Sequence, residues 1–253
     1  KNDKDIKFES YYLQDIWQVN HWLTAEAAAY YDRMHNANPI EDTDWTVAGF
    51  NPRLGLIVRP TARDTLRLAA FRYILPFISP RLDPTDVAGI QIFRNTLEGS
   101  ENTEFAFEWN HEWQSGFTNL GVFYLDKDFK EEIIEQGREV ERHLNGDVRG
   151  LEIEYNQLLT DQVGLLAGYR YLKVDDEVDP RQDPLNNVNR DEHLFRAGLR
   201  YVRPDGFTAG IAQTFRYIDN DNIRSNDSAA ITDIELAYQF PNRLGVASFK
   251  VLN

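Results

Sequence analysis

A period of two dominates the apolar pattern of this chain and recurs in many long segments. In 233–240, Ile234, Leu236 and Tyr238 alternate with charged or polar residues. Because successive side chains of a β-strand point to opposite faces, each such segment has one apolar and one polar face. The alternation predicts strands, and it assigns to one shared apolar face Ile234, Leu236, Tyr238, Leu151, Ile153, Phe195, Leu199 and Phe105.

Short turn signals alternate with long polar connections along the chain. The short ones, such as 60–64 and 203–206, contain the Pro, Gly, Asn and Asp of tight hairpins. The long connections are 35–46, 74–101, 128–145, 175–191 and 220–228, with a short helix expected at 129–136. This division predicts twelve strands, at 7–19, 23–34, 47–59, 65–73, 102–113, 117–127, 146–158, 163–174, 192–202, 207–218, 229–240 and 246–252.

These features are typical of an outer-membrane protein. A membrane-spanning helix needs about 20 apolar residues in a row, which this sequence lacks, whereas a spanning strand needs about ten with only alternate ones apolar. Tight turns on one side and long loops on the other are the usual barrel arrangement. We therefore predict an all-β fold, an antiparallel transmembrane β-barrel in which residues 1–253 form one domain of about twelve strands, a fragment of a larger barrel.

Aromatic residues gather beside the short turns, as expected of a girdle at the periplasmic interface. They are Trp17, Trp22, Trp113, Phe117, Phe207 and Phe240. Two polar residues, Asp15 and Gln213, fall on the apolar parity of their strands. We expect a local bulge or a subunit contact at each.

The composition argues against several other classes of protein. A net charge of −14 disfavours nucleic acid as a partner, because phosphate binding needs clustered Lys and Arg. There is no Cys, and His111-Glu112 lacks the second His of a zinc-protease helix. The acidic runs 175–179 and 219–222 lack the glycine of a calcium loop, so solvated charge is the favoured interpretation. We expect no enzyme activity, no cofactor and no metal.

Charged residues concentrate on the opposite, inward parity of the strands. The candidate lumen-lining residues are Arg170, Arg196, Arg200, Arg216, Glu108, Glu152, Glu154, Asp233 and Glu235. Two hypotheses remain for them. Cross-strand ladders of opposite charge are favoured, and an arginine strip that holds an anionic solute by bidentate contacts is the alternative. If the ladder is correct, replacing Arg170, Arg196 and Arg216 with Gln leaves anion binding unchanged.

Several short motifs, in order along the chain, resemble the barrel of TonB-dependent outer-membrane receptors. Gln14-Asp15-Ile16-Trp17 with Tyr31-Asp32 is similar to one strand pair of that family, and Asn51-Pro52-Arg53-Leu54-Gly55-Leu56 is similar to a hairpin. The run 249–253 is similar to the approach to the family's C-terminal element. The motif at 82–89 is similar to barrels fused to tetratricopeptide repeats. We expect an N-terminal plug or earlier strands, and the final strands, to lie outside this fragment.

The resemblance implies the wall of a transporter that moves a solute across the bacterial outer membrane. Its implied partners are outer-membrane lipid and lipopolysaccharide, with either a TonB-type inner-membrane complex or a periplasmic repeat domain. A polysaccharide-secretion porin is the alternative within membranes. A soluble all-β binding module is the alternative outside them, although long strands and an outward apolar face oppose it.

Overall fold

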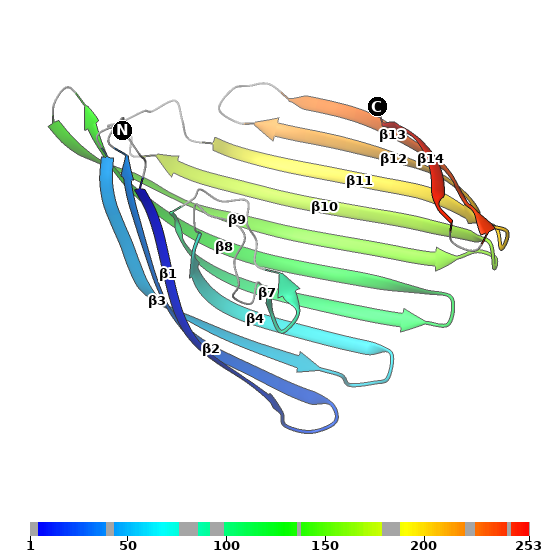
Figure 1. The fold of residues 1–253 in the computed structure, drawn as a ribbon, viewed down its shortest axis with the longest axis horizontal. Coiled ribbons are helices and arrows are strands. Elements are labelled where there is room, and N and C mark those ends of the chain that lie inside the picture. Colours follow the sequence, from blue (N-terminus) through cyan, green and yellow to red (C-terminus); the bar gives the residue numbers. More distant parts are fainter. Residues whose placement is uncertain are drawn as a thin grey trace.

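The computed structural model describes residues 5–38, 43–75, 86–91, 99–135, 138–178, 188–220, 226–241 and 244–252. Twelve long strands form one curved antiparallel sheet in which each strand pairs with the next along the chain (Figure 1). A separate two-stranded hairpin is inserted between the fourth and fifth of them. Among the described residues no pairing joins the first strand to the last, so the sheet is open. The predicted all-β antiparallel architecture is confirmed.

The twelve strands follow the predicted segments closely. In order they are β1 (Asp5–Gln18), β2 (Leu23–Asn38), β3 (Thr43–Val58), β4 (Asp64–Ile74), β7 (Glu101–Trp113), β8 (Gly116–Glu135), β9 (Arg138–Leu158), β10 (Val163–Val178), β11 (Val188–Val202), β12 (Phe207–Asn220), β13 (Asp227–Gln239) and β14 (Val246–Leu252). The small hairpin consists of β5 (Asp86–Val87) and β6 (Ile90–Gln91). No helix among the described residues is long and apolar enough to cross a membrane.

The turns that join β1 to β2, β3 to β4, β7 to β8, β9 to β10, β11 to β12 and β13 to β14 lie at one rim of the sheet, which we call the short-turn rim. The strand ends that the predicted long connections join lie at the opposite rim (Figure 1). Side chains fix the tight turns. Asn20 Oδ1 accepts the N–H groups of Trp22 and Leu23 at 2.9 Å. Thr160 Oγ1 accepts the N–H groups of Gln162 and Val163 at 3.2 and 3.1 Å. These side-chain caps are the usual way in which Asn and Thr stabilise a turn.

The register places the predicted apolar residues on one face, which we call the outer face. Ile153 lies opposite Tyr169, Tyr169 opposite Phe195, and Leu199 opposite Ile211. These side chains do not belong to the hydrophobic core, and most large members of the set are exposed, as Phe105 is at 54%. An apolar outer face that meets no other part of the protein is what a lipid-facing barrel wall requires.

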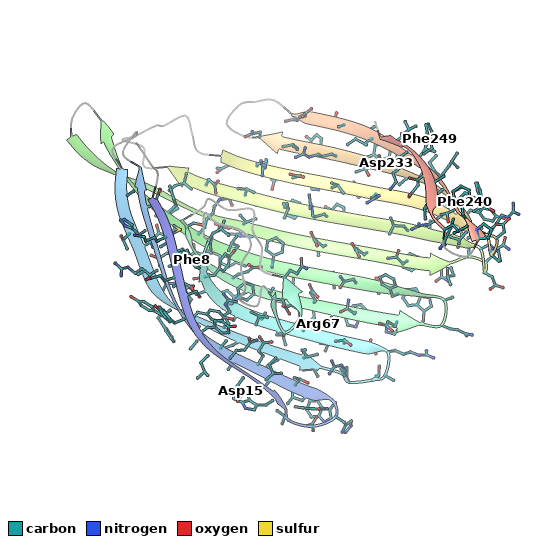
Figure 2. All side chains as sticks on the ribbon, viewed as in Figure 1. Phe8, Asp15, Arg67, Asp233, Phe240 and Phe249 are labelled. Carbon is teal, nitrogen blue, oxygen red and sulfur yellow. The ribbon has the colours of Figure 1, made fainter. Side chains whose placement is uncertain are left out.

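The two polar exceptions on the outer face are not bulges. Asp15 lies on the edge strand β1, opposite Ala27 of β2, and the register runs through it without interruption (Figure 2). Gln213 donates to the backbone carbonyl of Ile231 at 3.0 Å and accepts from Thr232 Oγ1 at 2.6 Å. The amide is therefore satisfied by the neighbouring strand. Neither position is a bulge, and the alternative of a subunit contact stays a prediction.

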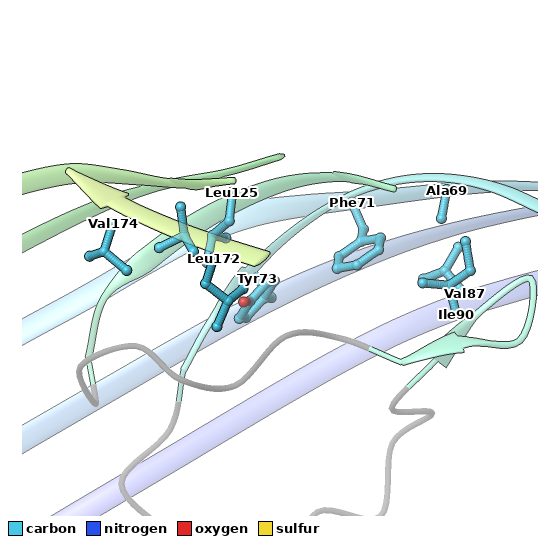
Figure 3. Packing of buried hydrophobic residues seen from close by; sticks show 9 residues of the cluster. Ala69, Phe71, Tyr73, Val87, Ile90, Leu125, Leu172 and Val174 are labelled. Carbon is cyan, nitrogen blue, oxygen red and sulfur yellow. The ribbon is translucent and has the colours of Figure 1, made fainter. Parts of the chain in front are cut away.

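The hydrophobic core lies on the other, inner face. The β5–β6 hairpin lies over this face, with Val87 and Ile90 packed near Ala69 and Phe71 of β4 (Figure 3). The cluster continues toward the rim of the long connections through Tyr73, Leu125, Val148, Leu172 and Val174. Sequence patterning had assigned only charged residues to the inner parity. The hairpin is the reason that part of it is apolar.

Two expectations, a short helix at 129–136 and a loop over 128–145, were wrong. The segment 129–136 is not a helix, because β8 continues to Glu135 and pairs with β9 almost to its tip. The expected loop 128–145 is thus a strand extension. In the connection 74–101, the described hairpin folds back over the inner face and does not point away from the sheet (Figure 1).

Candidate functional site

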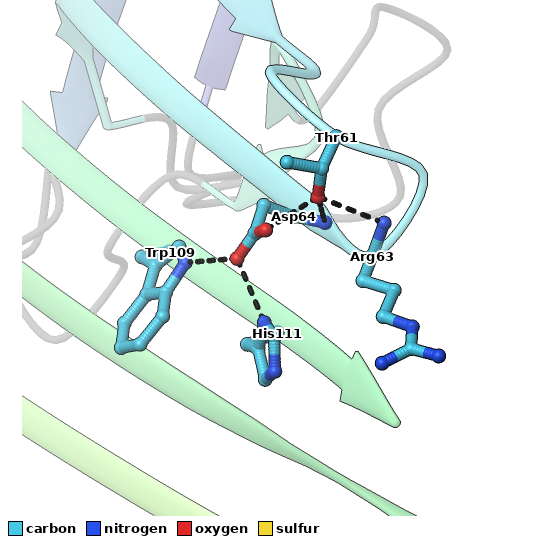
Figure 4. A network of polar contacts seen from close by, with 5 residues as sticks. All are labelled: Thr61, Arg63, Asp64, Trp109 and His111. Carbon is cyan, nitrogen blue, oxygen red and sulfur yellow. Dashed lines mark hydrogen bonds and ion pairs between the residues drawn. The ribbon is translucent and has the colours of Figure 1, made fainter. Parts of the chain in front are cut away.

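An aromatic belt marks the outer face near the short-turn rim. Trp109, His111 and Trp113 follow one another on β7, with ring centroids 5.9 and 5.8 Å apart, and Trp113 lies 5.6 Å from Tyr155 of β9. Asp64 organises the belt by accepting Trp109 Nε1 at 3.1 Å and contacting His111 Nδ1 at 2.8 Å (Figure 4). Amphipathic rings with polar anchors are typical of a membrane interface.

Thr61 joins this network from the preceding turn. Its hydroxyl donates to Asp64 Oδ2 and accepts the N–H groups of Arg63 and Asp64 (Figure 4). The other predicted girdle residues also lie at this rim, and Trp17 and Phe207 face outward opposite Ala25 and Tyr238. One assignment was wrong: Phe117 pairs with Glu112 and Asn156, on the inner face.

A second aromatic belt lies toward the opposite rim. Tyr171 and His193 have centroids 5.0 Å apart, and His193 lies 6.2 Å from both Tyr169 and Tyr217. The Tyr171 hydroxyl donates to Asp191 Oδ1 at 2.7 Å. On β12, the ten residue-to-residue steps from Phe207 to Tyr217 span about 33 Å along the strand, or about 25 Å vertically at a tilt of about 40°. Two belts at this separation fit the apolar thickness of an outer membrane.

The nine predicted lumen residues all lie on the inner face, in rows set by the register. Arg170 is opposite Glu152 and Leu194, and Leu194 is opposite Arg216, so the two arginines share one level. Arg196 lies two residues nearer the short-turn rim along β11, and Arg200 lies four residues beyond Arg196. Arg170, Arg196 and Arg216 therefore lie within one row of one another on the inner face.

The carboxylate that binds two of these arginines is one that sequence reasoning missed. Glu192 of β11 is buried and accepts from Arg170 Nη2 at 3.5 Å and from Arg216 Nε at 3.3 Å. Its parity is the same as that of Arg196, so the strand pattern held the signal. The predicted neutralising residues were Glu152, Glu154, Asp233 and Glu235, and none of the four contacts Arg170 or Arg216 through a hydrogen bond or ion pair in the described structure.

Two further predicted residues form cross-strand pairs elsewhere on the inner face. Lys250 Nζ lies 3.1 Å from Glu235 Oε1, and Arg67 Nη1 lies 3.9 Å from Glu108 Oε2. The side chains of Glu152, Glu154 and Asp233 make no hydrogen bond or ion pair within the described part of the chain. The inner face therefore carries both ladder pairs and charges without a protein partner.

Arg196 and Arg200 are two of the charges without a protein partner among the described residues. Neither makes an ion pair or hydrogen bond within the described ranges, and both are exposed. Arg196 lies between Gly168 and Thr214, and Arg200 lies between Gly164 and Gly210. Small neighbours on both sides leave each guanidinium free to move over the wall. The two arginines line an open hollow of about 880 Å³, together with Asp233, Glu235 and Lys250.

We call this part of the inner face the bare region: the short-turn half of β9–β14, from Glu152 to Lys250. The covered region is the inner face of β2–β4 and β7, with the adjoining ends of β8–β10. There Arg53 is 1% exposed and its guanidinium carbon lies 3.6 Å from the centre of the Tyr30 ring. Asp32, wholly buried, accepts from Ser10 Oγ at 2.6 Å and from Asn51 Nδ2 at 2.5 Å.

The acidic runs considered for calcium lie partly outside the described residues. Of the described side chains, Asp176 lies 2.6 Å from Lys127 Nζ, which gives its carboxylate a protein cation. No three described His, Asp or Glu side chains are grouped as metal ligands.

An antiparallel meander with an apolar outer face, two aromatic belts and a charged inner face defines the wall of an outer-membrane β-barrel. The family model for the TonB dependent receptor-like β-barrel matches residues 1–253. The chain belongs to that family, whose location is the bacterial outer membrane. No match was found among curated proteins. Among solved structures, an outer membrane channel from Pseudomonas putida F1 is similar at 11% identity and a TM-score of 0.44, covering 96% of this chain and 83% of the channel.

Proposed function

We propose that this chain forms part of the wall of a channel that carries a polar solute across the outer membrane. The observation that supports this most directly is the bare region. Arg196 and Arg200 line its hollow without protein partners, on an inner face that faces away from lipid. A charged surface of this kind must be solvated, because an unpaired charge removed from water would cost several kcal/mol.

The lining favours the passage of solute over tight structural packing. Glycines at 164, 168, 198 and 210 form a low floor around the two arginines. Where the wall needs charge balance it uses pairs, as with Glu192 and its two arginines. Arg196 and Arg200 have no ion-pair partner among the described residues. A guanidinium is suited to contact carboxylate or phosphate in two parallel hydrogen bonds. The proposal thus gives the chain a transport role and assigns no catalysis to it.

Membership of the TonB-dependent receptor-like family supports energised uptake in the full-length protein, through a TonB-type complex of the inner membrane. The outer face and its two belts support contact with outer-membrane lipid and lipopolysaccharide. The energy source and the lipid contacts are both parts of the proposal.

The test uses the full-length protein in the outer membrane of a bacterial host that lacks its own general porins. A periplasmic β-lactamase reports the entry of nitrocefin, an anionic cephalosporin, as the rate of hydrolysis by intact cells. We expect faster hydrolysis than in cells with an empty vector. Equal rates at matched protein levels would contradict a channel. A protonophore that abolishes the increase supports energised uptake, whereas an increase that survives it contradicts the TonB component.

The two kinds of arginine provide a matched comparison within the same assay. Arg196→Gln with Arg200→Gln is expected to lower nitrocefin entry several-fold, more strongly at low ionic strength, because unpaired charges are screened by salt. Arg170→Gln with Arg216→Gln is the control, since both arginines already bind Glu192. Equal effects of the two double variants would contradict a special role for the bare region and favour ladders throughout.

A further inference from the structure

The β5–β6 hairpin has a defined geometry that places its tip against the inner face. Its two turn residues, Ala88 and Gly89, have φ angles of +53° and +80°, the backbone of the tight two-residue turn that suits a twisted hairpin. Val87 and Ile90 flank the turn and pair with each other. Val87 is wholly buried, and Ala88 and Ile90 are 2% and 4% exposed. The tip is therefore packed against the wall.

A socket in the wall receives this tip. The Ala88 N–H donates to Glu26 Oε2 at 2.8 Å, and the other oxygen of Glu26 accepts from Gln14 at 2.9 Å. A Cβ placed on Gly55 would lie 2.8 Å from the Ala88 methyl and 3.0 Å from a Val87 methyl. Only glycine at position 55 leaves room for the hairpin to approach so closely.

The socket lies deep in the wall. Gly55 is three residues from the end of β3 at Val58, and Arg67 is three residues from the start of β4 at Asp64, so both lie about 10 Å along their strands from the short-turn rim. The hairpin enters from the connection after β4, which leaves the sheet at the opposite rim. Its described residues lie beside β4 from Arg67 to Phe71. Arg67 lies beside it, with Nε 3.3 Å from a Cβ placed on Gly89 (Figure 2).

The backbone of Ala88 is unusual for a residue with a side chain. A non-glycine residue with positive φ carries a strain of order 1 kcal/mol and persists where its surroundings hold it. Here the hydrogen bond to Glu26 and the burial of Val87 and Ile90 hold it. A hairpin held by a hydrogen bond, a glycine socket and apolar burial together is a fixed part of the wall.

We propose that the seated β5–β6 hairpin is the element that limits solute size, because it fills the lumen beside β2–β4 and β7 and confines passage to the bare region. The inference rests on the proposed channel function. It assigns the hairpin and its socket residues Glu26 and Gly55 to specificity, and it leaves the contact with the solute to the wall of β9–β14.

Seating is tested first, by cross-linking in the full-length protein. These 253 residues contain no cysteine, so within them a pair introduced as Ala69→Cys and Val87→Cys, two side chains of one buried cluster, reports on this contact. We expect a disulfide to form on oxidation in cells and the Gly168→Cys, Val87→Cys pair to remain reduced. Adding Ile90→Ser removes the other apolar anchor and should lower the yield. No disulfide in the first pair would overturn the proposal.

The size limit is tested next, with two probes in the porin-deficient host. Nitrocefin reports the entry of a small solute, and killing by vancomycin reports the entry of a much larger one. Gly55→Ala and the Val87→Ser, Ile90→Ser double variant should raise vancomycin susceptibility several-fold. Gly49→Ala, on the same strand and face as Gly55, is the matched control, because its Cβ would meet only ordinary contacts of 3.9 Å or more. The cross-linked Ala69→Cys, Val87→Cys protein should keep the wild-type limit.

The possible failures are distinguishable. If wild type admits nitrocefin and the unseated variants do not change vancomycin susceptibility, the hairpin does not set the size limit and this inference is overturned alone. If no form of the protein admits nitrocefin above the empty-vector rate, the channel itself is overturned, and the size limit with it. Loss of nitrocefin entry in the cross-linked protein would show that the hairpin must move, which overturns a fixed constriction.

Discussion

The covered and bare regions share one sheet and one alternation of side chains, yet inward charged side chains are buried in the first and exposed in the second. In the covered region, Arg53, Asp32 and Glu104 are almost fully buried. In the bare region, Arg196 and Arg200 are exposed and have no partner among the described residues. The backbone pairing is continuous across both, so the sheet itself does not cause the difference. The cause is what lies on the inner face.

The comparison shows that a barrel wall by itself does not decide the environment of its inward side chains. Under a cover, a polar group must find a protein partner, because water no longer supplies one. On the bare wall, water or a solute supplies it. An inward charge in the covered region is therefore interpreted first as structural. An unpaired inward charge in the bare region is interpreted first as a contact with solute.

The largest expected difference concerns two lysines. Lys127 Nζ lies 2.6 Å from Asp176 in the covered region, with side-chain exposures of 8% and 16%. Lys127→Met leaves a largely buried carboxylate without its cation and should cost about 3–5 kcal/mol of unfolding free energy. Lys250→Met, in a pair with exposures of 55% and 37%, should cost about 0–1 kcal/mol. Urea unfolding in lipid vesicles measures both, and equal losses would remove the distinction between the regions.

Substitutions on the outer face should reduce the unfolding free energy by similar amounts behind the covered region and behind the bare region. Leu54 lies on the outer face behind the covered region, and Leu199 lies on the outer face behind the bare region, exposed by 58% and 47%. An arginine at either position meets lipid, at a cost of about 2–4 kcal/mol near the middle of the membrane. Leu54→Arg and Leu199→Arg should therefore reduce the unfolding free energy by similar amounts. A loss confined to one of them would show that the outer faces also differ.

Inward glycines should separate the regions again, by a smaller amount. A Cβ on Gly150 would lie 2.0 Å from the Phe123 ring, which packs against the core of the covered region. Gly150→Ala forces that ring to move and should cost about 1–3 kcal/mol. Gly168→Ala has room and should change stability by less than about 1 kcal/mol. The same unfolding assay decides, and a neutral Gly150→Ala would show that the covered side chains repack freely.

The smallest expected effect lies at the boundary between the regions, where Glu192 binds Arg170 and Arg216. Glu192→Gln removes the charge but keeps the shape, and should cost about 1–2 kcal/mol because two charge-assisted contacts weaken. It also converts two paired arginines into unpaired ones. Nitrocefin entry should therefore rise, in the direction opposite to that of Arg196→Gln. No change in entry would show that these two arginines do not reach the solute path.

Much of the fold could be predicted from the sequence, because in a meander each strand pairs with its neighbour in the chain and carries its own two-faced pattern. The extension of β8 and β9 could not, since the dense charge of 128–145 masks the alternation. The register there continues without interruption from the body of the two strands to Glu135 and Arg138.

The candidate site was predicted less completely than the fold. Parity alone placed Arg170, Arg196, Arg200 and Arg216 on the inner face, but it could not say which would be paired. The partner Glu192 was missed although it has the right parity, because it stands at the first position of its predicted strand. The hairpin depends on Glu26 and Gly55, far away in sequence. Locally, the sequence offered the apolar residues Val87 and Ile90 on either side of Ala88-Gly89.

The order of the socket along the chain has a consequence for assembly. Glu26, Gly55, Arg67 and Phe71 all precede the hairpin in sequence, on strands that pair only with their immediate neighbours. A growing sheet therefore completes the socket before β7 adds to β4. The hairpin can dock onto a four-stranded platform while the barrel is still open, when no closed wall restricts its path. The space beside these four strands can therefore be filled before the barrel closes.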